Sequence, residues 1–260
     1  MWTPRVIPCL LMHKGGLYKT VKFRDARYVG DPINAVRILN EKEVDELLLV
    51  DIDATAHGRE PHFAQIEDIV GEAFMPVAYS GGVTSVEQMK RLFALGVEKV
   101  FTSSAALASP DLVADAAARF GSQSIGVVLD VKRGWGSSRF GLVTHNGRRK
   151  AELTAAEAAR LMEGRGAGEL LVNSVDRDGT MTGYDLEAIR TVTLAVGIPV
   201  IALGGAGSLA DLARAVREGG ASAAAAGSLF VFTGVHRAVL ITYPAQAEIE
   251  RLFGGGCDGA

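Results

Sequence analysis

An aspartate ends one of the apolar segments of this chain. The segment reads Gly126-Val-Val-Leu-Asp130 and continues into Val-Lys132-Arg133, so Asp130 is the first polar group after an apolar run. At the carboxyl end of a strand in a parallel α/β fold, a carboxyl group is well placed to act as a general acid or base. A structural role, in which Asp130 caps a nearby turn, is the less favoured interpretation. Asp130 is therefore the first candidate for proton transfer.

Two glycine-rich turns follow other apolar segments and are typical of phosphate binding. They are Gly81-Gly82 and Gly204-Gly-Ala-Gly207. Glycine lets backbone N–H groups approach an anion, and the helix that follows adds its positive end. The next segment in each case ends in small residues, Ser103-Ser104 and Gly227-Ser228. Tight turns alone would explain one such pair, but two pairs favour a ligand with two phosphates.

Further polar residues follow two more apolar segments. Asp178 and Gly179 are interpreted as a ligand loop. Three aspartates fit equally well as site residues or as ion-pair partners of Arg59 and Arg177: Asp51, Asp53 and Asp176. The five histidines have no metal-ligand spacing, and neither a nucleophile elbow nor a Walker loop is present, so no metal or cofactor is predicted.

Eight short apolar segments would hold these residues, and they alternate with helical patterns. Near-continuous apolar character is typical of strands covered on both faces, and eightfold alternation predicts a single (β/α)8 TIM barrel of the α/β class. N-cap residues open several helices, at Ser85, Ser109-Pro110 and Thr154. Helical patterns include 31–43, 84–96, 154–165, 184–196 and 207–219. The expected strands are Arg5–Leu11, Glu46–Ile52, Pro76–Ser80, Glu98–Ser103, Ser124–Val131, Glu169–Val175, Pro199–Leu203 and Ser222–Ala226.

The two halves of the chain resemble each other. Residues 75–85, Met-Pro-Val-Ala-Tyr-Ser-Gly-Gly-Val-Thr-Ser, match residues 198–208, Ile-Pro-Val-Ile-Ala-Leu-Gly-Gly-Ala-Gly-Ser, at an offset of 123 residues. A repeat of this length predicts two half-barrels of four βα units each. We expect them at about 1–121 and 122–253, with a glycine-rich tail at 254–260.

The repeat also reveals an absence. The first strand reads Pro8-Cys-Leu-Leu11-Met-His13, and matching its end to that of the segment around Asp130 places Leu11 opposite this aspartate. Two carboxyl groups facing each other could divide the acid and base roles. In this chain one of the two positions is aliphatic.

Composition and charge exclude several classes of protein. The chain has 260 residues, of which 48% are hydrophobic and 22% charged, with a net charge of −3. These values give no reason to expect nucleic-acid binding, and no apolar run reaches the ~18 residues of a membrane span. The amino terminus has no signal-peptide pattern, and Cys9 and Cys257 are not expected to form a disulfide, so we expect a cytoplasmic protein.

Along nearly its whole length the chain resembles the cyclase subunit of imidazole glycerol phosphate synthase, HisF. The resemblance implies a barrel that receives ammonia from a glutaminase docked beneath it and passes it up the barrel axis to a bis-phosphate ribonucleotide. The segments that carry it are Arg5-Val-Ile-Pro-Cys-Leu, Gly30-Asp-Pro32, Asp45-Glu-Leu47, Gly96-Val-Glu-Lys-Val100, Arg119-Phe-Gly-Ser-Gln123, Asp176-Arg-Asp-Gly-Thr180, Gly183-Tyr-Asp185 and Gly204-Gly-Ala-Gly207.

The resemblance implies roles at the carboxyl ends of the strands. Asp130 matches one of the family's two catalytic aspartates and Leu11 stands at the other position, while Lys19 matches a loop lysine. Ser103 and Leu203 replace an expected asparagine and an expected serine, and Ser103 is kept among the candidate phosphate ligands. The other expected phosphate contacts are Gly82, Ser104, Asp178, Gly179, Gly205, Gly227 and Ser228.

The same resemblance implies an ammonia gate at the amino ends of the strands. The family's ring of four charges matches Arg5, Glu46, Lys99 and Glu169, with none missing. A layer of ion pairs that only stabilises the barrel is the alternative, although buried pairs are weak stabilisers. Glu98 and Gln123 are also kept on this side and favour a docking surface for a glutaminase.

These features lead to one leading hypothesis and two alternatives. Loss of a general acid or base typically slows a reaction by about 10²–10⁴-fold, so we expect an ammonia-channelling HisF-like subunit. Four further segments are 31–35, 74–76, 227–232 and 236–244. In these segments the chain resembles the WbuZ-type paralogues associated with surface-glycan amidation. That resemblance implies a HisH-like glutaminase, a sugar amidotransferase as further partner and an acetamidino sugar as product. The alternatives are a working cyclase of histidine biosynthesis, with Lys19, Asp51 or His13 replacing the missing acid, and a non-catalytic sensor of a phosphorylated ligand that activates the glutaminase.

Overall fold

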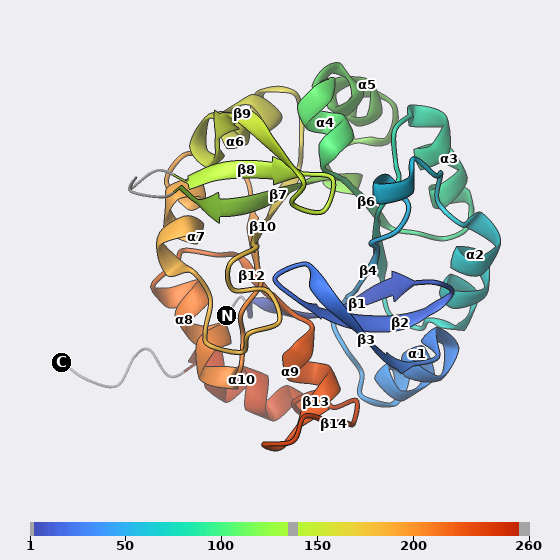
Figure 1. The fold of residues 1–260 in the computed structure, drawn as a ribbon, viewed down its shortest axis with the longest axis vertical. Coiled ribbons are helices and arrows are strands. Elements are labelled where there is room, and N and C mark those ends of the chain that lie inside the picture. Colours follow the sequence, from blue (N-terminus) through green and yellow to red (C-terminus); the bar gives the residue numbers. More distant parts are fainter. Residues whose placement is uncertain (1–2, 135–139, 255–260) are drawn as a thin grey trace.

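Eight parallel strands close into a ring in the computed structural model, which describes residues 3–134 and 140–254 (Figure 1). The final pairing, between β7 and β10, closes the barrel and confirms the predicted (β/α)8 fold. Around the ring the strands are β1 (Arg5–His13), β4 (Leu47–Asp51), β5 (Val77–Ser80), β6 (Lys99–Thr102), β7 (Ile125–Arg133), β10 (Glu169–Ser174), β11 (Val200–Leu203) and β12 (Ala223–Ala226). We call the carboxyl ends of these strands the mouth and their amino ends the floor.

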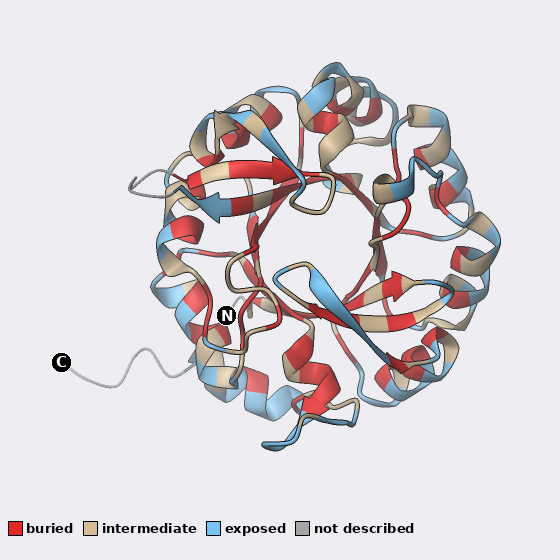
Figure 2. Cartoon of the chain, viewed as in Figure 1, coloured by how far each residue is buried: buried red, intermediate tan, exposed pale blue. Residues whose placement is uncertain are grey.

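Helices surround the ring and turn their buried faces towards it (Figure 2). The predicted caps at Ser85 and Thr154 are confirmed, since each hydroxyl accepts a hydrogen bond from a backbone N–H of the first turn. The predicted Ser109 cap is wrong: Pro110 precedes the helix, and the Ser109 carbonyl, not its hydroxyl, receives the N–H of Leu112. The helices are α1 (Pro32–Glu41), α2 (Phe63–Glu72), α3 (Val86–Ala94), α4 (Ser104–Ala108), α5 (Asp111–Phe120), α6 (Ala155–Gly164), α7 (Leu186–Thr193), α8 (Leu209–Arg217), α9 (Ser228–Val231) and α10 (Gln246–Gly254).

Two antiparallel hairpins extend strands of the ring at the mouth. The first, β2 (Gly16–Val21) and β3 (Arg24–Gly30), follows β1, and the second, β8 (Phe140–Thr144) and β9 (Arg149–Thr154), follows β7. In Figure 1 both hairpins lie across the near end of the barrel. The sequence analysis left these segments as connections, so the hairpins are additions to the predicted fold.

The inside of the barrel is apolar between mouth and floor. Gly126 makes room there for the Phe101 ring, because a Cβ at that position would collide with it. Cys9 belongs to this lining as a free, buried thiol, whereas Cys257 and the predicted tail from residue 255 onward lie outside the described residues. No helix in the described ranges is long and apolar enough to cross a membrane. The lining consists of Ile7, Cys9, Leu48, Ala78, Phe101, Val128, Leu171, Ile201, Ala223 and Ala225.

Candidate functional site

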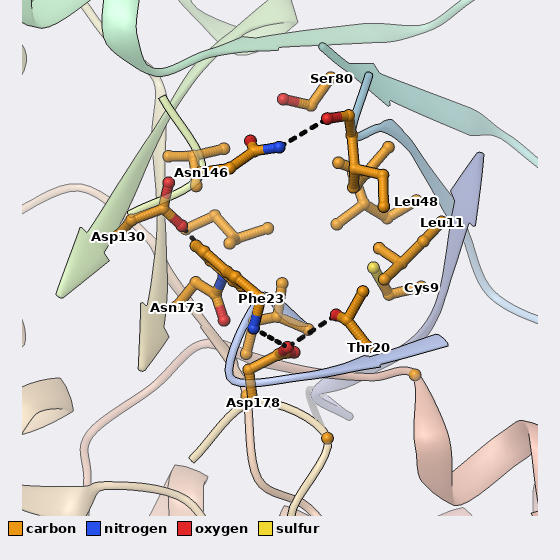
Figure 3. Close-up of a pocket in the computed structure, with 18 of the residues that line it drawn as sticks. Cys9, Leu11, Thr20, Phe23, Leu48, Ser80, Asp130, Asn146, Asn173 and Asp178 are labelled. Atoms are coloured by element: carbon orange, nitrogen blue, oxygen red, sulfur yellow. Dashed lines mark hydrogen bonds between the residues drawn. The ribbon is translucent and has the colours of Figure 1, made fainter. Parts of the chain in front are cut away.

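A cavity opens at the mouth, and nearly all of the candidate catalytic and phosphate-binding residues line it (Figure 3). One side, formed by the ends of β5, β6, β7 and β10, presents polar groups such as Ser80, Asp130 and Asn173. The other side, formed by β1, β4, β11 and β12, carries the aliphatic side chains of Leu11, Val50 and Leu203, with Asp51 at the end of β4. The candidates in the cavity wall are Leu11, Lys19, Asp51, Ser103, Ser104, Asp130, Asp178, Gly179, Gly205, Gly227 and Ser228. Gly82 lies instead in an adjoining pocket, where its N–H donates to Thr55 Oγ1 at 3.2 Å.

Asp130 lies on the polar side of the cavity and is hydrogen-bonded to Asn173 on β10. Asn173 Nδ2 donates to Asp130 Oδ1 at 3.0 Å. Burial raises the pKa of Asp130 to about 7; contacts with Asn173 and Ser103 act in the opposite direction, and the nearby Asp178 carboxylate adds to the increase. A carboxyl group that titrates near neutrality can give or take a proton under physiological conditions. The sequence analysis missed Asn173, although it directly follows the apolar run Leu170–Val172.

Leu11 lies in the cavity wall, at the position where the resemblance places the family's other catalytic aspartate. It lies in register with Val50 of β4, and both pack against the interior lining together with Leu203 of β11. In Figure 3 Leu11 and Cys9 lie across the cavity from Asp130. An isobutyl group cannot exchange a proton, so acid–base chemistry at this wall would need another residue.

Lys19 reaches the cavity from the first hairpin. It is 5% exposed, and its Nζ donates to the Cys9 carbonyl oxygen. Burial lowers the pKa of this amine, with smaller opposing effects from Cys9 and Asp178. A side chain at Gly227 would occupy the space of the ammonium group, so this glycine is needed for close packing as well as for any phosphate contact.

Asp178 anchors the turn of the first hairpin to the loop after β10. Its carboxylate accepts hydrogen bonds from Thr20 Oγ1 at 3.0 Å and from the Phe23 N–H at 3.5 Å. Burial raises the pKa of Asp178, which these hydrogen bonds and Lys19 partly oppose. Gly179 has a φ of +69°, and a Cβ there would collide with the Thr20 carbonyl. The ligand loop predicted at these two positions therefore has a structural role in holding the hairpin.

Asp51 and Asp53 make contacts that hold the mouth together. Asp51 Oδ1 accepts from the N–H groups of Asp53 and Ala54, at 2.8 and 3.0 Å. Asp53 accepts from His13 Nδ1 at 2.6 Å and forms an ion pair with Arg59 at 3.6 Å. The pKa of Asp53 is lowered: burial opposes the shift, but the Lys14 N–H, His13 and Arg59 together outweigh it.

The second hairpin contributes residues that the sequence analysis did not identify. At its turn the Asn146 side chain donates to the Ile52 carbonyl at 2.6 Å, and the His145 N–H donates to Ser104 Oγ at 3.1 Å. Both residues line the cavity. Nothing in the local sequence signals this contact, since it depends on the hairpin reaching across the mouth. No group of three or more His, Cys, Asp or Glu residues in the described part of the chain could hold a metal ion.

The four predicted gate residues meet at the floor in one closed ring. Arg5 contacts both carboxylates, Glu46 and Glu169, through its two terminal nitrogens. Lys99 Nζ lies 3.3 Å from Glu46 and 3.1 Å from Glu169, so each charge has two partners of opposite sign. The pKa of Arg5 is raised, because the two carboxylates outweigh the opposing effect of burial. Glu98 and Gln123 are exposed.

Comparisons with known proteins give the same family along the chain. The profile described as "Histidine biosynthesis protein" matches residues 5–236. A protein from Leptospira borgpetersenii named "Putative imidazole glycerol phosphate synthase subunit HisF" is 45% identical over 253 residues, covering 97% of this chain and all of the relative. The subunit hisF2 of Pseudomonas aeruginosa, named in the same way, is 49% identical over 95% of this chain and 98% of its own length. The subunit hisF3 of Vibrio vulnificus, also so named, is 48% identical over 96% of both chains.

Proposed function

The chain belongs to the histidine biosynthesis protein family as a HisF-like paralogue, and from this premise we propose that it is an ammonia-conducting subunit of a glutamine-dependent amidotransferase system. One observation carries the proposal. The ring at the floor has all four charges paired, whereas at the mouth an aliphatic side chain, Leu11, stands across the cavity from Asp130. Groups needed to admit ammonia are present, and one of the two acids needed to cyclise a substrate is not.

The apolar interior supports passage of ammonia in its neutral form. Neutral ammonia can enter an apolar environment at moderate cost, whereas an ammonium ion without partners cannot. Between the ring and Asp130, buried apolar side chains such as Ile7, Leu48 and Phe101 form one cluster inside the barrel. In this proposal the ring of Arg5, Glu46, Lys99 and Glu169 forms the entrance, and its balanced charges leave no net charge on the axis.

The floor supports docking of a HisH-like glutaminase. Its loops expose two large apolar side chains, Phe74 at 87% and Leu194 at 81%. Exposed apolar groups near polar ones are typical of protein interfaces. In the proposal they join Glu98 and Gln123 in the docking surface.

The ammonia acceptor is the finer part of the proposal. A sugar amidotransferase would take the ammonia at the mouth and convert an acetamido sugar into an acetamidino sugar of a bacterial surface polysaccharide. Support for this step is the resemblance of several segments to glycan-amidation paralogues, together with the missing acid. The glycine-rich turns at Gly205 and Gly227, which are predicted to bind phosphate, would then bind a regulatory ligand or remain unused.

A second candidate function, a working cyclase, is favoured by the position of Lys19. Of the three residues considered as substitutes for the missing acid, Lys19 alone is an ionisable group with its titrating atom buried at the cavity wall. His13 is paired with Asp53, and Asp51 is occupied by two backbone N–H groups. A lysine whose pKa is lowered can act as a base.

An assay with ammonium chloride and the bis-phosphate ribonucleotide separates the two functions. We expect no turnover above background by the purified protein. Turnover of about 1 s⁻¹ or more, a rate typical of enzymes, would contradict the proposal and support the working cyclase. Lys19→Met is the matched variant, since it would abolish turnover only in the second case.

A further inference from the structure

Two polar atoms near the ends of the strands on either side of β7 lack the hydrogen-bond partners that buried groups normally have. Ser103 Oγ, after β6, and Asn173 Oδ1, on β10, are buried without a hydrogen-bond partner among the described residues. Between them, on β7, Asp130 uses one carboxyl oxygen for Asn173 Nδ2. Buried polar atoms without partners are rare in folded proteins, and each one indicates a place where a ligand or a water molecule can bind.

The depth of these residues argues for a built site. Asn173 is 7% exposed and lies in the cavity wall, which also includes Asp130 on the neighbouring strand β7 and Ser103 directly after β6. The Gly204 turn packs against Asn173 Oδ1, and a Cβ on Gly204 would lie 2.7 Å from that oxygen. The amide is thus held in one orientation, with its Nδ2 given to Asp130 and its oxygen free.

The chemistry of the free atoms selects the ligand. An amide oxygen and a carboxylate oxygen accept hydrogen bonds, and the serine hydroxyl can also accept one. Three acceptors suit a small donor and repel a phosphate or another oxyanion. The wall opposite them includes the aliphatic side chains of Leu11, Val50 and Leu203.

We propose that Asp130, Asn173 and Ser103 form a binding site for ammonia at the top of the barrel, where it is held as ammonium. The inference rests on the proposed function, because ammonia that has passed the apolar interior meets these atoms first. Asp130 gives its proton to the ammonia nitrogen: the O–H bond breaks, an N–H bond forms, and a carboxylate–ammonium pair results. The proton returns to the carboxylate when neutral ammonia leaves towards the acceptor.

The ionisation of Asp130 is consistent with this exchange. Burial raises the pKa of Asp130 to about 7, so the protonated form is available before ammonia arrives. Ammonia is a stronger base than a carboxylate and takes the proton, after which the opposite charges stabilise each other in the desolvated pocket.

Titrations of the full chain, followed by the backbone amide NMR signals of residues 103, 130 and 173, test the site. The ligands are ammonium chloride and potassium chloride, because potassium matches ammonium in charge and size but donates no hydrogen bond. We expect saturable shifts with ammonium and at least ~10-fold weaker binding of potassium. Equal binding of both ions, or no saturable shift with ammonium, would overturn the proposal.

Variants locate the binding. Asn173→Leu should weaken ammonium binding at least ~10-fold, and Ser103→Ala about 3-fold, each measured as the change in Kd. Ser109→Ala, which removes an exposed hydroxyl outside the cavity, should leave the affinity unchanged. Unchanged affinity in Ser103→Ala would overturn the assignment even if Asn173→Leu fails to fold.

The outcome also separates this inference from the proposed function. Stimulation of a glutaminase by the chain does not require the ammonium site. Stimulation without ammonium binding would therefore reject the site alone, while ammonium binding without stimulation would reject the proposed function.

Discussion

The floor and the mouth of this barrel hold ionisable side chains in opposite ways. At the floor, Arg5 is kept charged by two carboxylates. At the mouth, burial raises the pKa values of Asp130 and Asp178 and lowers that of Lys19, so the neutral form of each group is favoured. The difference teaches that one end is built for fixed charge, and the other for proton exchange with a small ligand.

The largest expected effect comes from breaking the floor ring. Glu169→Ala leaves Arg5 and Lys99 with one carboxylate between them, and removing one member of a buried ion pair typically costs about 3–5 kcal/mol. We expect a loss of about 4 kcal/mol in the free energy of unfolding, measured by urea denaturation. Glu98→Ala, at an exposed position of the same face, should change it by less than about 0.5 kcal/mol. A similar loss of unfolding free energy in both variants would show that the ring contributes no more to stability than an exposed charge on the same face.

A pH series sharpens the comparison at the mouth. The folded-state pKa of Asp130 is about 7, above its ordinary value of 3.8, so the folded protein binds more protons between these values. The contribution of Asp130 to stability therefore falls as pH rises from about 4 to about 7 and is constant above. Relative to Asp130→Asn, the free energy of unfolding of the wild type should fall by about 2–4 kcal/mol over this pH interval, measured by urea denaturation at several pH values. A difference that is constant with pH would show that burial does not raise this pKa.

The first hairpin offers a third test, because its anchor needs a glycine. Gly179→Ala adds a Cβ that collides with the Thr20 carbonyl at a positive φ. Gly58→Ala has a similar φ of +63° but open space around the new Cβ. We expect a loss of about 2–3 kcal/mol for Gly179→Ala and about 1 kcal/mol for Gly58→Ala, from thermal unfolding. Equal losses of stability in the two variants would mean that the close contact between Gly179 and the hairpin contributes nothing to stability.

The smallest expected effect on stability comes from restoring the missing acid. Leu11→Asp places a carboxyl group at a partly exposed position of the apolar wall, which should cost about 1–2 kcal/mol at pH 7. We expect measurable cyclase activity only if the glycine cradles still bind the bis-phosphate substrate, with Leu11→Asn as the inactive control. Turnover by Leu11→Asp without substrate binding that titration calorimetry detects would refute this expectation.

Much of the fold could be predicted from the sequence, because every strand of a closed barrel is buried on both faces and reads as an apolar run. The two hairpins were missed since segments such as Arg24–Gly30 are largely exposed and carry charges. For the site, the repeat located Asp130 and Leu11 correctly at the mouth. The contacts of Asn146 could not be predicted, because they join residues 94 positions apart that only the folded hairpin brings together.

The central claim is that the floor still serves a glutaminase although the mouth has lost an acid. The most direct test is the rate of glutamine hydrolysis by the cognate HisH-like subunit, measured with and without this chain. The account predicts a faster rate with the wild type and an equally fast rate with Leu11→Asp, since position 11 lies at the opposite end of the barrel from the docking surface. An unchanged rate on addition of the wild-type chain would contradict the account.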